Sequence, residues 1–164
     1  MEFIEFNMQD ENMKKRLLPL YQIYEAEISE EELDEFYPAE SLDELLIHFI
    51  EYFNGKTTYI CVMDYEYKGF ITFHIDCEKT PGYAVGYEGW GHLSEIYTDK
   101  QSRRLGLGKA MVKKAEEELK ILDIKGIHLM NLLPENIGFW KSLNYIDTGK
   151  VEPVEGGRIF EKHL

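Results

Sequence analysis

Cysteine is scarce in this chain, and long apolar runs are absent. The two cysteines, Cys61 and Cys77, stand in separate strand-like segments. They lack the close pairing of a zinc site or a redox motif, so we expect buried, reduced thiols and no metal site. No apolar run approaches the ~20 residues that span a bilayer. The acidic start of the sequence lacks the basic region of a signal peptide, so we expect a cytoplasmic protein with no membrane partner.

Basic residues are also few. The sequence has 18 Lys and Arg against 31 Asp and Glu, which gives a formal net charge of −13. Nucleic-acid binding draws its affinity from clustered Lys and Arg, so this balance argues against a nucleic-acid partner. A cationic substrate suits an acidic chain better, although most of these carboxylates are expected to form a solvated surface.

The basic residues that are present gather in one place. Six of the 18 fall between residues 100 and 114, and residues 100–115 contain no Asp or Glu. They are Lys100, Arg103, Arg104, Lys109, Lys113 and Lys114. Such a basic island in an acidic chain predicts a polyanionic ligand at that place.

Length and periodicity predict a single mixed α/β domain over residues 1–164. The 44% hydrophobic content suits one globular core. Helices are predicted over residues 11–27, 42–53, 107–122 and 134–143, and strands over 3–6, 58–63, 69–75, 92–98, 126–130, 145–149 and 158–163, with a hairpin turn at 66–68. Ser41 and Glu44 form a predicted capping box. The order β-α-α-β-β-β-α-β-α-β-β implies a mixed sheet flanked by helices rather than regular alternation.

A glycine loop in the basic island joins a predicted strand to a predicted helix. The pattern Arg103-x-x-Gly106-x-Gly108 lets a phosphate approach the backbone, where helix-start amides and the helix dipole meet it. A Walker loop would need Gly at Arg103 and Ser or Thr at Ala110, and a dinucleotide fingerprint would need Gly or Ala at Met111. These mismatches argue against a nucleotide-binding switch or kinase and against NAD binding.

With its flanking segments, this loop resembles the GNAT superfamily of N-acetyltransferases. The strand Leu93-Ser94-Glu95-Ile96-Tyr97-Thr98 precedes the loop at the family's usual distance. The late segment 136–145, Asn-Ile-Gly-Phe-Trp-Lys-Ser-Leu-Asn-Tyr, resembles the family's second motif. The two motifs lie within residues 92–145, about a third of the chain. The resemblance implies a GNAT-like fold, with a central mixed, mostly antiparallel sheet of about six to seven strands flanked by about four helices.

The resemblance implies an enzyme that transfers an acetyl group from acetyl-CoA to a primary amine of a small molecule or peptide by direct attack. The backbone of Ile96, Tyr97 and Thr98 would pair with the pantetheine arm and the acetyl group, and an amide near Thr98 would polarise the thioester carbonyl. The residues that would hold the pyrophosphate are Arg103, Arg104, Leu105, Gly106, Leu107, Gly108 and Lys109. A homodimer is compatible with the resemblance.

The residues that would move protons match the family less well. An attacking amine must be neutral, so a base must take a proton from its ammonium form. Glu95 is the candidate catalytic base, but neighbouring strand residues face opposite sides, and Ser94 could hold a water instead. Trp140 stands where the family often has Tyr, and indole cannot serve as a general acid. Either the thiolate leaves unassisted, or another phenol, Tyr97 or Tyr145, reaches it.

One further position departs from the family pattern. The pantetheine-binding Asn of the family falls on Leu133, so Asn131 or Asn136 would substitute for it, and Asn136 is preferred for its place in the helix. Because Trp140 and Ser94 leave the acid and base groups open, a non-catalytic acyl-CoA-binding regulatory module is the alternative function.

On the acceptor side, an acidic run and a loop with aromatic residues allow two interpretations. Residues 25–35 hold six Glu and one Asp, followed by Phe36 and Tyr37, and the Gly- and Pro-containing loop 79–91 carries Tyr83, Tyr87 and Trp90. Together they predict either an acidic, aromatic-lined mouth for an amine cation or a solvated helix end with ordinary core aromatics.

Overall fold

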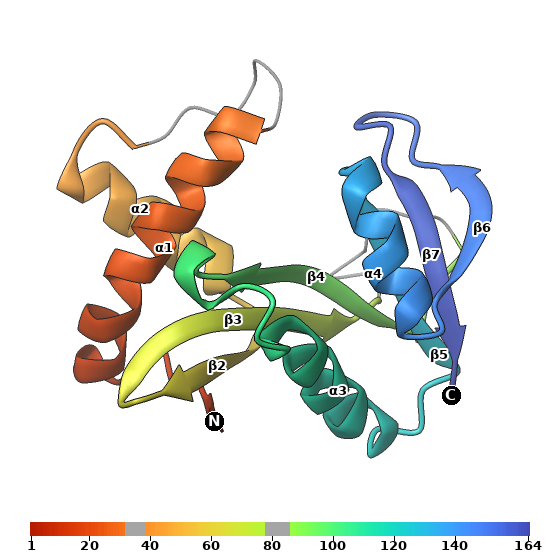
Figure 1. Ribbon diagram of the computed structural model, residues 1–164, viewed down its shortest axis with the longest axis horizontal. Coiled ribbons are helices and arrows are strands. Elements are labelled where there is room, and N and C mark those ends of the chain that lie inside the picture. Colours follow the sequence, from red (N-terminus) through yellow and green to blue (C-terminus); the bar gives the residue numbers. More distant parts are fainter. Residues whose placement is uncertain (32–38, 78–85) are drawn as a thin grey trace. The chain divides into compact units, whose positions relative to one another are not determined.

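The computed structural model describes residues 1–31, 39–77 and 86–164, with the side chains of residues 29–31 left out. Its elements (Figure 1) are β1 (Glu2–Glu5), α1 (Glu11–Glu31), α2 (Leu42–Phe53), β2 (Thr57–Met63), β3 (Glu66–Ile75), β4 (Gly91–Thr98), η1 (Lys100–Ser102), α3 (Leu107–Lys120), β5 (Gly126–Asn131), η2 (Pro134–Asn136), α4 (Ile137–Ser142), β6 (Ile146–Val151) and β7 (Arg158–His163), where η marks a 3-10 turn. None of the helices in these described ranges has the length and apolar character needed to cross a membrane.

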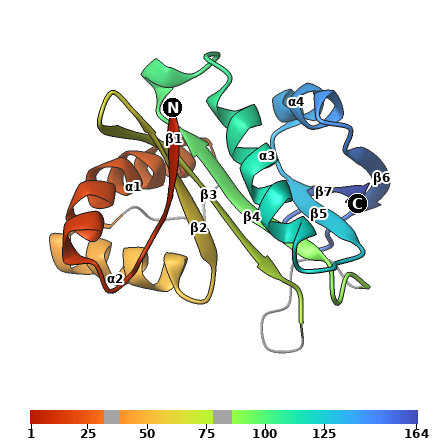
Figure 2. The ribbon, with the colours of Figure 1, turned by 90° about the horizontal axis from the view of Figure 1, so that it is seen from below.

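The strands form a mixed sheet in the order β1-β2-β3-β4-β5-β7-β6. Figure 2 shows β2, β3 and β4 running side by side. The pairs β1–β2, β5–β7 and β6–β7 are antiparallel, whereas β4 and β5 are parallel. The parallel pairing joins Gly91 to Ile127 and His92 to His128. The predicted fold class and element order are therefore confirmed.

Two local predictions are wrong. The turn between β2 and β3 lies at Asp64 and Tyr65, not at residues 66–68. Both residues have positive φ, 53° and 66°, as in the two-residue turns that match the twist of a hairpin. Neither residue is glycine, so the turn signal in the sequence is weak and rests on Asp64 alone. Cys61 is buried as expected, but Cys77 is exposed, because it follows the end of β3.

The chain forms two compact units. The first comprises residues 1–70 and 96–111, and the second comprises residues 71–95 and 112–164. In the first unit, α1 and α2 lie alongside each other (Figure 1) and share an aromatic core. Tyr24 of α1 packs against Phe70 of β3 and Tyr97 of β4, with ring centroids 5.2 and 5.3 Å apart. This packing fixes the end of β4 against α1.

The start of α2 confirms the Ser41 half of the predicted capping box. The Ser41 hydroxyl accepts a hydrogen bond from the Glu44 amide at 3.2 Å. The Glu44 carboxylate accepts from the Glu40 amide at 2.8 Å, one residue earlier than the reciprocal bond of a capping box. Leu45, Phe49 and Phe53 are the buried stripe of this helix, as their spacing predicts.

In the second unit, β5 lies between β4 and β7 and carries much of the core. Ile127 and Leu129 of β5 and Phe160 of β7 are fully or almost fully buried. A Cβ atom at Gly126 would lie 2.4 Å from the Trp90 ring. Only glycine therefore lets the Trp90 indole pack on the start of β5.

Candidate cofactor loop and catalytic strand

The predicted phosphate loop connects β4 to α3 through two left-handed residues. Asp99 caps the short η1 turn that follows β4. Arg104 then has φ 64° and Gly106 has φ 85°, and α3 begins at Leu107. A Cβ at Gly106 would meet no atom within 4 Å, so its glycine is required by backbone conformation and not by space. The predicted helix start is confirmed.

The first turn of α3 presents backbone donors. The amide of Ala110 donates to the Gly106 carbonyl at 3.1 Å, so the amides of Leu107, Gly108 and Lys109 precede the hydrogen-bond ladder of the helix. The positive end of the helix dipole adds to their field. Gly106 and the side chain of Lys109 are exposed. This geometry suits an anion.

Arg104 and Arg103, neighbours in the loop, have different surroundings. Arg104 is exposed and forms no ion pair with any described residue. The guanidinium of Arg103 donates through Nε to the Thr98 carbonyl at 3.0 Å and through a terminal nitrogen to Glu27 at 2.5 Å. Arg104 is therefore available to a ligand, whereas Arg103 ties the loop to β4 and α1.

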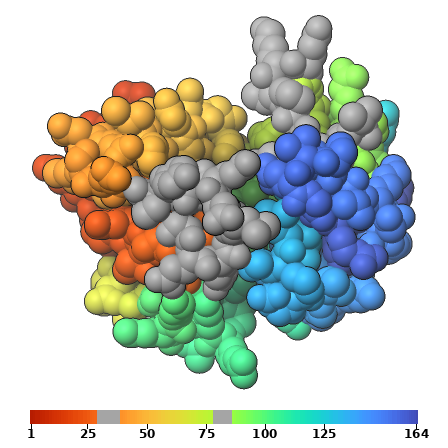
Figure 3. Space-filling model, turned by 90° about the horizontal axis from the view of Figure 1, so that it is seen from above, coloured from red at the N-terminus to blue at the C-terminus, as the bar shows by residue number. Residues whose placement is uncertain are grey.

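Glu27 is the buried carboxylate that Arg103 contacts. It is 7% exposed and also accepts a hydrogen bond from the Tyr97 hydroxyl at 2.9 Å. The Lys100 ammonium lies 3.6 Å from the same carboxylate. Figure 3 shows the green atoms of the segment after β4 beside the red and orange atoms of α1. One carboxylate thus holds the strand end, the turn and the loop.

Replacing Glu27 with Ala is expected to destabilise the protein by about 2 kcal/mol. Breaking a buried ion pair costs about 3–5 kcal/mol, but the Arg103 side chain is 41% exposed, which lowers the cost. The melting temperature should fall by about 4–8 °C for a chain of this size. Glu11→Ala, which removes a surface pair with Lys14, is the control. Equal melting temperatures of the two variants would contradict the anchoring role.

The two phenols considered as general acids both hold their protons tightly. Burial and the hydrogen bond to Glu27 raise the pKa of Tyr97 well above its usual range. Burial and the nearby Glu116 carboxylate do the same to the pKa of Tyr145. A phenol with a raised pKa is a weak proton donor to a thiolate of pKa about 8.5. Both environments argue against a role for these residues as the acid.

Trp140 and Asn131 are bonded to each other in the second unit. The Trp140 indole is buried and donates to the side-chain oxygen Oδ1 of Asn131 at 3.1 Å. The Asn131 amide nitrogen donates to the Leu133 carbonyl at 2.8 Å. Asn136 is exposed at the start of α4, where its side chain makes no capping bond. Of the two candidate asparagines, Asn136 is the one whose side chain is not committed to such an internal network.

The strand residues proposed for proton transfer are half-buried. Ser94 and Glu95 lie in the middle of β4. The Ser94 hydroxyl lies 3.0 Å from Nδ1 of His74, within hydrogen-bond distance. Ser94 thus connects β4 to a group of histidines that the sequence pattern did not indicate.

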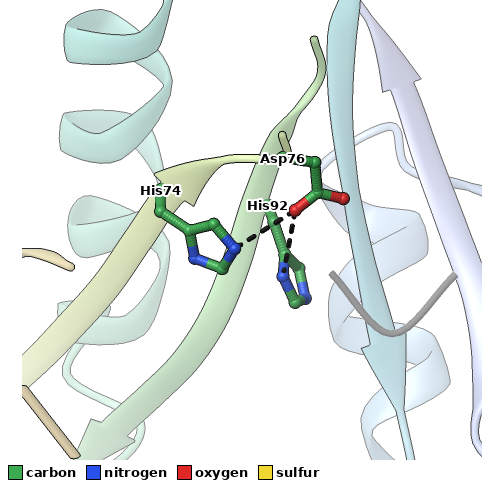
Figure 4. Close-up of side chains that lie close together, drawn as sticks. All are labelled: His74, Asp76 and His92. Carbon is green, nitrogen blue, oxygen red and sulfur yellow. Dashed lines mark ion pairs between the residues drawn. The ribbon is translucent and has the colours of Figure 1, made fainter. Parts of the chain in front are cut away.

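This group, the histidine cluster, consists of His74, Asp76, His92 and His128. The Asp76 carboxylate oxygen Oδ1 lies 3.1 Å from Nε2 of His74 and 3.7 Å from Nδ1 of His92, and its Oδ2 lies 2.5 Å from Nε2 of His128. Figure 4 shows both His74 and His92 pointing toward the same carboxylate oxygen. Burial opposes ionisation of Asp76, but the hydrogen bond from His128 and the other imidazoles hold its pKa at about 2.

The sequence contains one weak signal for this cluster. His74 and Asp76 stand two residues apart, and alternate residues of a strand share a face. Strand pairing supplies the rest, because His92 and His128 are opposite each other in the β4–β5 register. Their ring centroids are 4.6 Å apart and the rings are nearly parallel. The sequence alone does not indicate that these two histidines are neighbours, because their proximity depends on the strand register.

Most of the described residues proposed for an acceptor mouth are buried, whereas Trp90 is half-buried. Glu25 is buried and lies 2.6 Å from Nδ1 of His48. Glu27 is buried against Arg103, and Tyr87 is buried with its hydroxyl donating to Glu161 at 2.9 Å. Predictions for Tyr83, Phe36, Tyr37 and the side chains of Glu30, Glu31, Glu32, Asp34 and Glu35 lie outside the described residues. The interpretation of Glu25, Glu27 and Tyr87 as an open mouth is therefore wrong.

The family model of the acetyltransferase (GNAT) family matches residues 19–145. This segment includes the whole loop, β4 and the whole late segment. No curated protein sequence matches the chain significantly.

Several solved structures share the fold at low sequence identity. Ribosomal-protein-alanine N-acetyltransferase from Brucella melitensis is 14% identical, with full coverage of both chains and a TM-score of 0.71. Aminoglycoside 6'-acetyltransferase type Ii is 18% identical over 99% of this chain and 97% of its own, with a TM-score of 0.70. A protein from Bacillus anthracis assigned as a streptothricin acetyltransferase, solved with acetyl coenzyme A, is 19% identical over 66% of this chain and 62% of its own, with a TM-score of 0.56.

Proposed function

The chain belongs to the GNAT family of acetyltransferases, and we propose from this premise that it transfers the acetyl group of acetyl-CoA to a primary amine of a small molecule or peptide. The enzyme class and the cofactor follow from the family. We propose the class of acceptor and the residues that bind the cofactor and transfer protons.

The loop at residues 103–109 fits the pyrophosphate of the cofactor. Three early amides of α3, an exposed Gly106 with positive φ, and the exposed cations Arg104 and Lys109 meet at one helix start. Helix starts with such donors bind phosphate through amides and dipole together. This convergence is the observation that carries the proposal. Arg103 contributes indirectly, because its guanidinium holds the loop to Thr98 and Glu27.

The remaining cofactor contacts are assigned to β4 and α4. We assign the backbone of Ile96, Tyr97 and Thr98 to the pantetheine arm and acetyl group, and the exposed Asn136 side chain to the pantetheine amides. When bound, acetyl-CoA supplies an activated acyl group on a thiol leaving group.

The proton chemistry is assigned to this chain's own residues. Glu95 is the proposed base that receives the ammonium proton, and a water held by the Ser94 hydroxyl is the alternative. Because the pKa values of Tyr97 and Tyr145 are raised and Trp140 donates to Asn131, the thiolate is proposed to leave without an acid from these side chains.

An acetyl-transfer assay over a panel of amines tests this function. We expect release of free thiol from acetyl-CoA with at least one of a polyamine, an aminoglycoside, an amino acid and a peptide with a free amino terminus. Mass spectrometry of the product should show one added acetyl group on nitrogen. Tight cofactor binding without turnover on any amine would instead favour the acyl-CoA-binding regulatory module.

Four expectations about the whole protein also stay predictions. We propose a single acetyltransferase domain over residues 1–164, a cytoplasmic location, a homodimer, and no nucleic-acid or membrane partner. The net charge of −13 supports the exclusion of nucleic acid. Light scattering of the purified chain would decide the oligomeric state.

A further inference from the structure

The histidine cluster joins three consecutive strands of the second unit through buried groups. Asp76, His92 and His128 are between 1% and 3% exposed, and His74 is partly buried. The Asp76 amide donates to the Trp90 carbonyl and its carbonyl accepts from the Gly89 amide, at 2.9 and 2.8 Å. These backbone bonds hold the backbone of Asp76 beside residues 89 and 90 at the end of β3.

The cluster contains buried polar atoms that the described protein groups do not satisfy. Nε2 of His74 and Oδ1 of Asp76 lie 3.1 Å apart, but their relative orientation does not make a hydrogen bond. Neither atom has another hydrogen-bond partner among the described residues. Buried polar atoms normally have such a partner, so each exception needs an explanation. A group that accepts lone pairs from both atoms would satisfy them together.

The separations of these atoms match the ligands of a metal ion. With metal–ligand distances of about 2.0–2.2 Å, tetrahedral zinc ligands lie about 3.3 Å from one another. Oδ1 of Asp76 is 3.1 Å from Nε2 of His74 and 3.7 Å from Nδ1 of His92, and the three atoms lie within 4.8 Å of one another. In Figure 4 the two imidazoles approach one oxygen from β3 and β4.

The residues behind these three atoms would orient the ligands. Nδ1 of His74 faces the Ser94 hydroxyl at 3.0 Å, so Nδ1 can carry the proton and leave Nε2 with a lone pair. Nε2 of His128 holds the second oxygen of Asp76 at 2.5 Å. Metal-binding histidines and carboxylates commonly have such outer partners. Tyr87 stacks on His128, with ring centroids 4.3 Å apart, and keeps that ring in place.

We propose that Nε2 of His74, Oδ1 of Asp76 and Nδ1 of His92 bind a zinc ion. Two imidazoles and one carboxylate suit zinc and other divalent transition metals, whereas Mg²⁺ and Ca²⁺ prefer oxygen ligands. Three protein ligands leave one tetrahedral position for water. The ion fastens the end of β3 to the start of β4. This site is separate from the phosphate loop, and its test does not depend on acetyl transfer.

Zinc titration of chelator-treated, metal-free protein tests the site. Calorimetry should show about one Zn²⁺ bound per chain, and Zn²⁺ should raise the melting temperature. His74→Gln and His92→Gln should each weaken binding about 100-fold or more, and His128→Gln, which alters only the outer partner, about 10–100-fold. His163→Gln is the control, because His163 forms a surface pair with Glu161 at 3.4 Å and its loss should leave the affinity unchanged.

Histidine NMR of the unaltered chain keeps the test decisive if a variant fails to fold. The sequence contains five histidines. Zn²⁺ should shift the ring nitrogens Nε2 of His74 and Nδ1 of His92 strongly, while His48 and His163 stay unchanged. No binding by the unaltered chain would overturn the proposal. So would zinc affinity that survives in both His74→Gln and His92→Gln, or shifts confined to His48 or His163.

Discussion

Replacing both Arg104 and Lys109 with Glu should weaken binding of acetyl-CoA about 100-fold. Each reversal puts a negative charge beside the proposed pyrophosphate position, and a loss of about 1.4 kcal/mol per site is a factor of ten in affinity. Both side chains are exposed on the loop, so their replacement does not disturb the core. Calorimetry with CoA at low ionic strength measures the effect, and added salt should reduce the difference, because exposed charges are screened.

The matched control for this variant is Lys120→Glu with Lys125→Glu. These two residues are exposed at the far end of α3 and after it, and the double change alters the net charge by the same amount. Its CoA affinity should stay within about threefold of the unaltered chain, since charges beyond a Debye length of about 10 Å are screened. If both double variants bind CoA as the unaltered chain does, the loop does not hold the pyrophosphate.

Arg103 is a poor choice for the same experiment. A carboxylate at position 103 would face the buried Glu27, and like charges at such a distance destabilise the fold. Weaker cofactor binding by an Arg103→Glu variant could then result either from a disturbed loop structure or from the loss of a direct contact with the cofactor. The two arginines look equivalent in sequence, and only their tertiary neighbours separate them.

Replacing Glu95 with Gln should lower kcat about 100-fold or more, with a small change in KM for acetyl-CoA. Gln keeps the size and hydrogen-bonding capacity of the side chain but cannot accept the ammonium proton, and a positioned base contributes about 10²–10⁴-fold. Steady-state kinetics of the two proteins with one acceptor amine measures both constants.

Two further variants show whether Glu95 acts itself. Glu88→Gln removes an exposed carboxylate from the turn before β4 and should leave kcat unchanged. Ser94→Ala removes the hydroxyl that lies against His74 and should lower kcat less than Glu95→Gln does. The reverse order, with a large loss in Ser94→Ala and a normal rate in Glu95→Gln, would assign the base to a water held at Ser94.

The secondary structure and the loop were predictable because their signals are local. Glycine at position 106 and the absence of carboxylates over residues 100–115 belong to one short segment, and the structure has the helix start there. The stripe of Leu45, Phe49 and Phe53 likewise follows from helical spacing. The turn at Asp64 and Tyr65 was missed because its signal is weak: Asp tolerates the positive φ that the hairpin imposes, but Tyr does not favour it.

Side-chain environments were less predictable, because they depend on segments far apart in the chain. The acidic run around residue 25 suggested a solvated or ligand-binding surface, yet Glu25 and Glu27 are buried against His48 and Arg103. The sequence does not indicate which residue a given carboxylate contacts in the folded protein. Burial of these two groups follows from the packing of α1 with α2 and with the segment after β4.

The sequence by itself determined the family, the order of the elements and the place of the phosphate loop, since each rests on residues close together in the chain. Tertiary structure decided that Arg103 is bonded to Glu27 while Arg104 has no ion pair with a described residue, and that Trp140 donates to Asn131. It also brought His74, Asp76 and His92 to one point through the pairing of β3 with β4. These contacts depend on strand register and burial, and neither can be predicted from residues that are close together in the sequence.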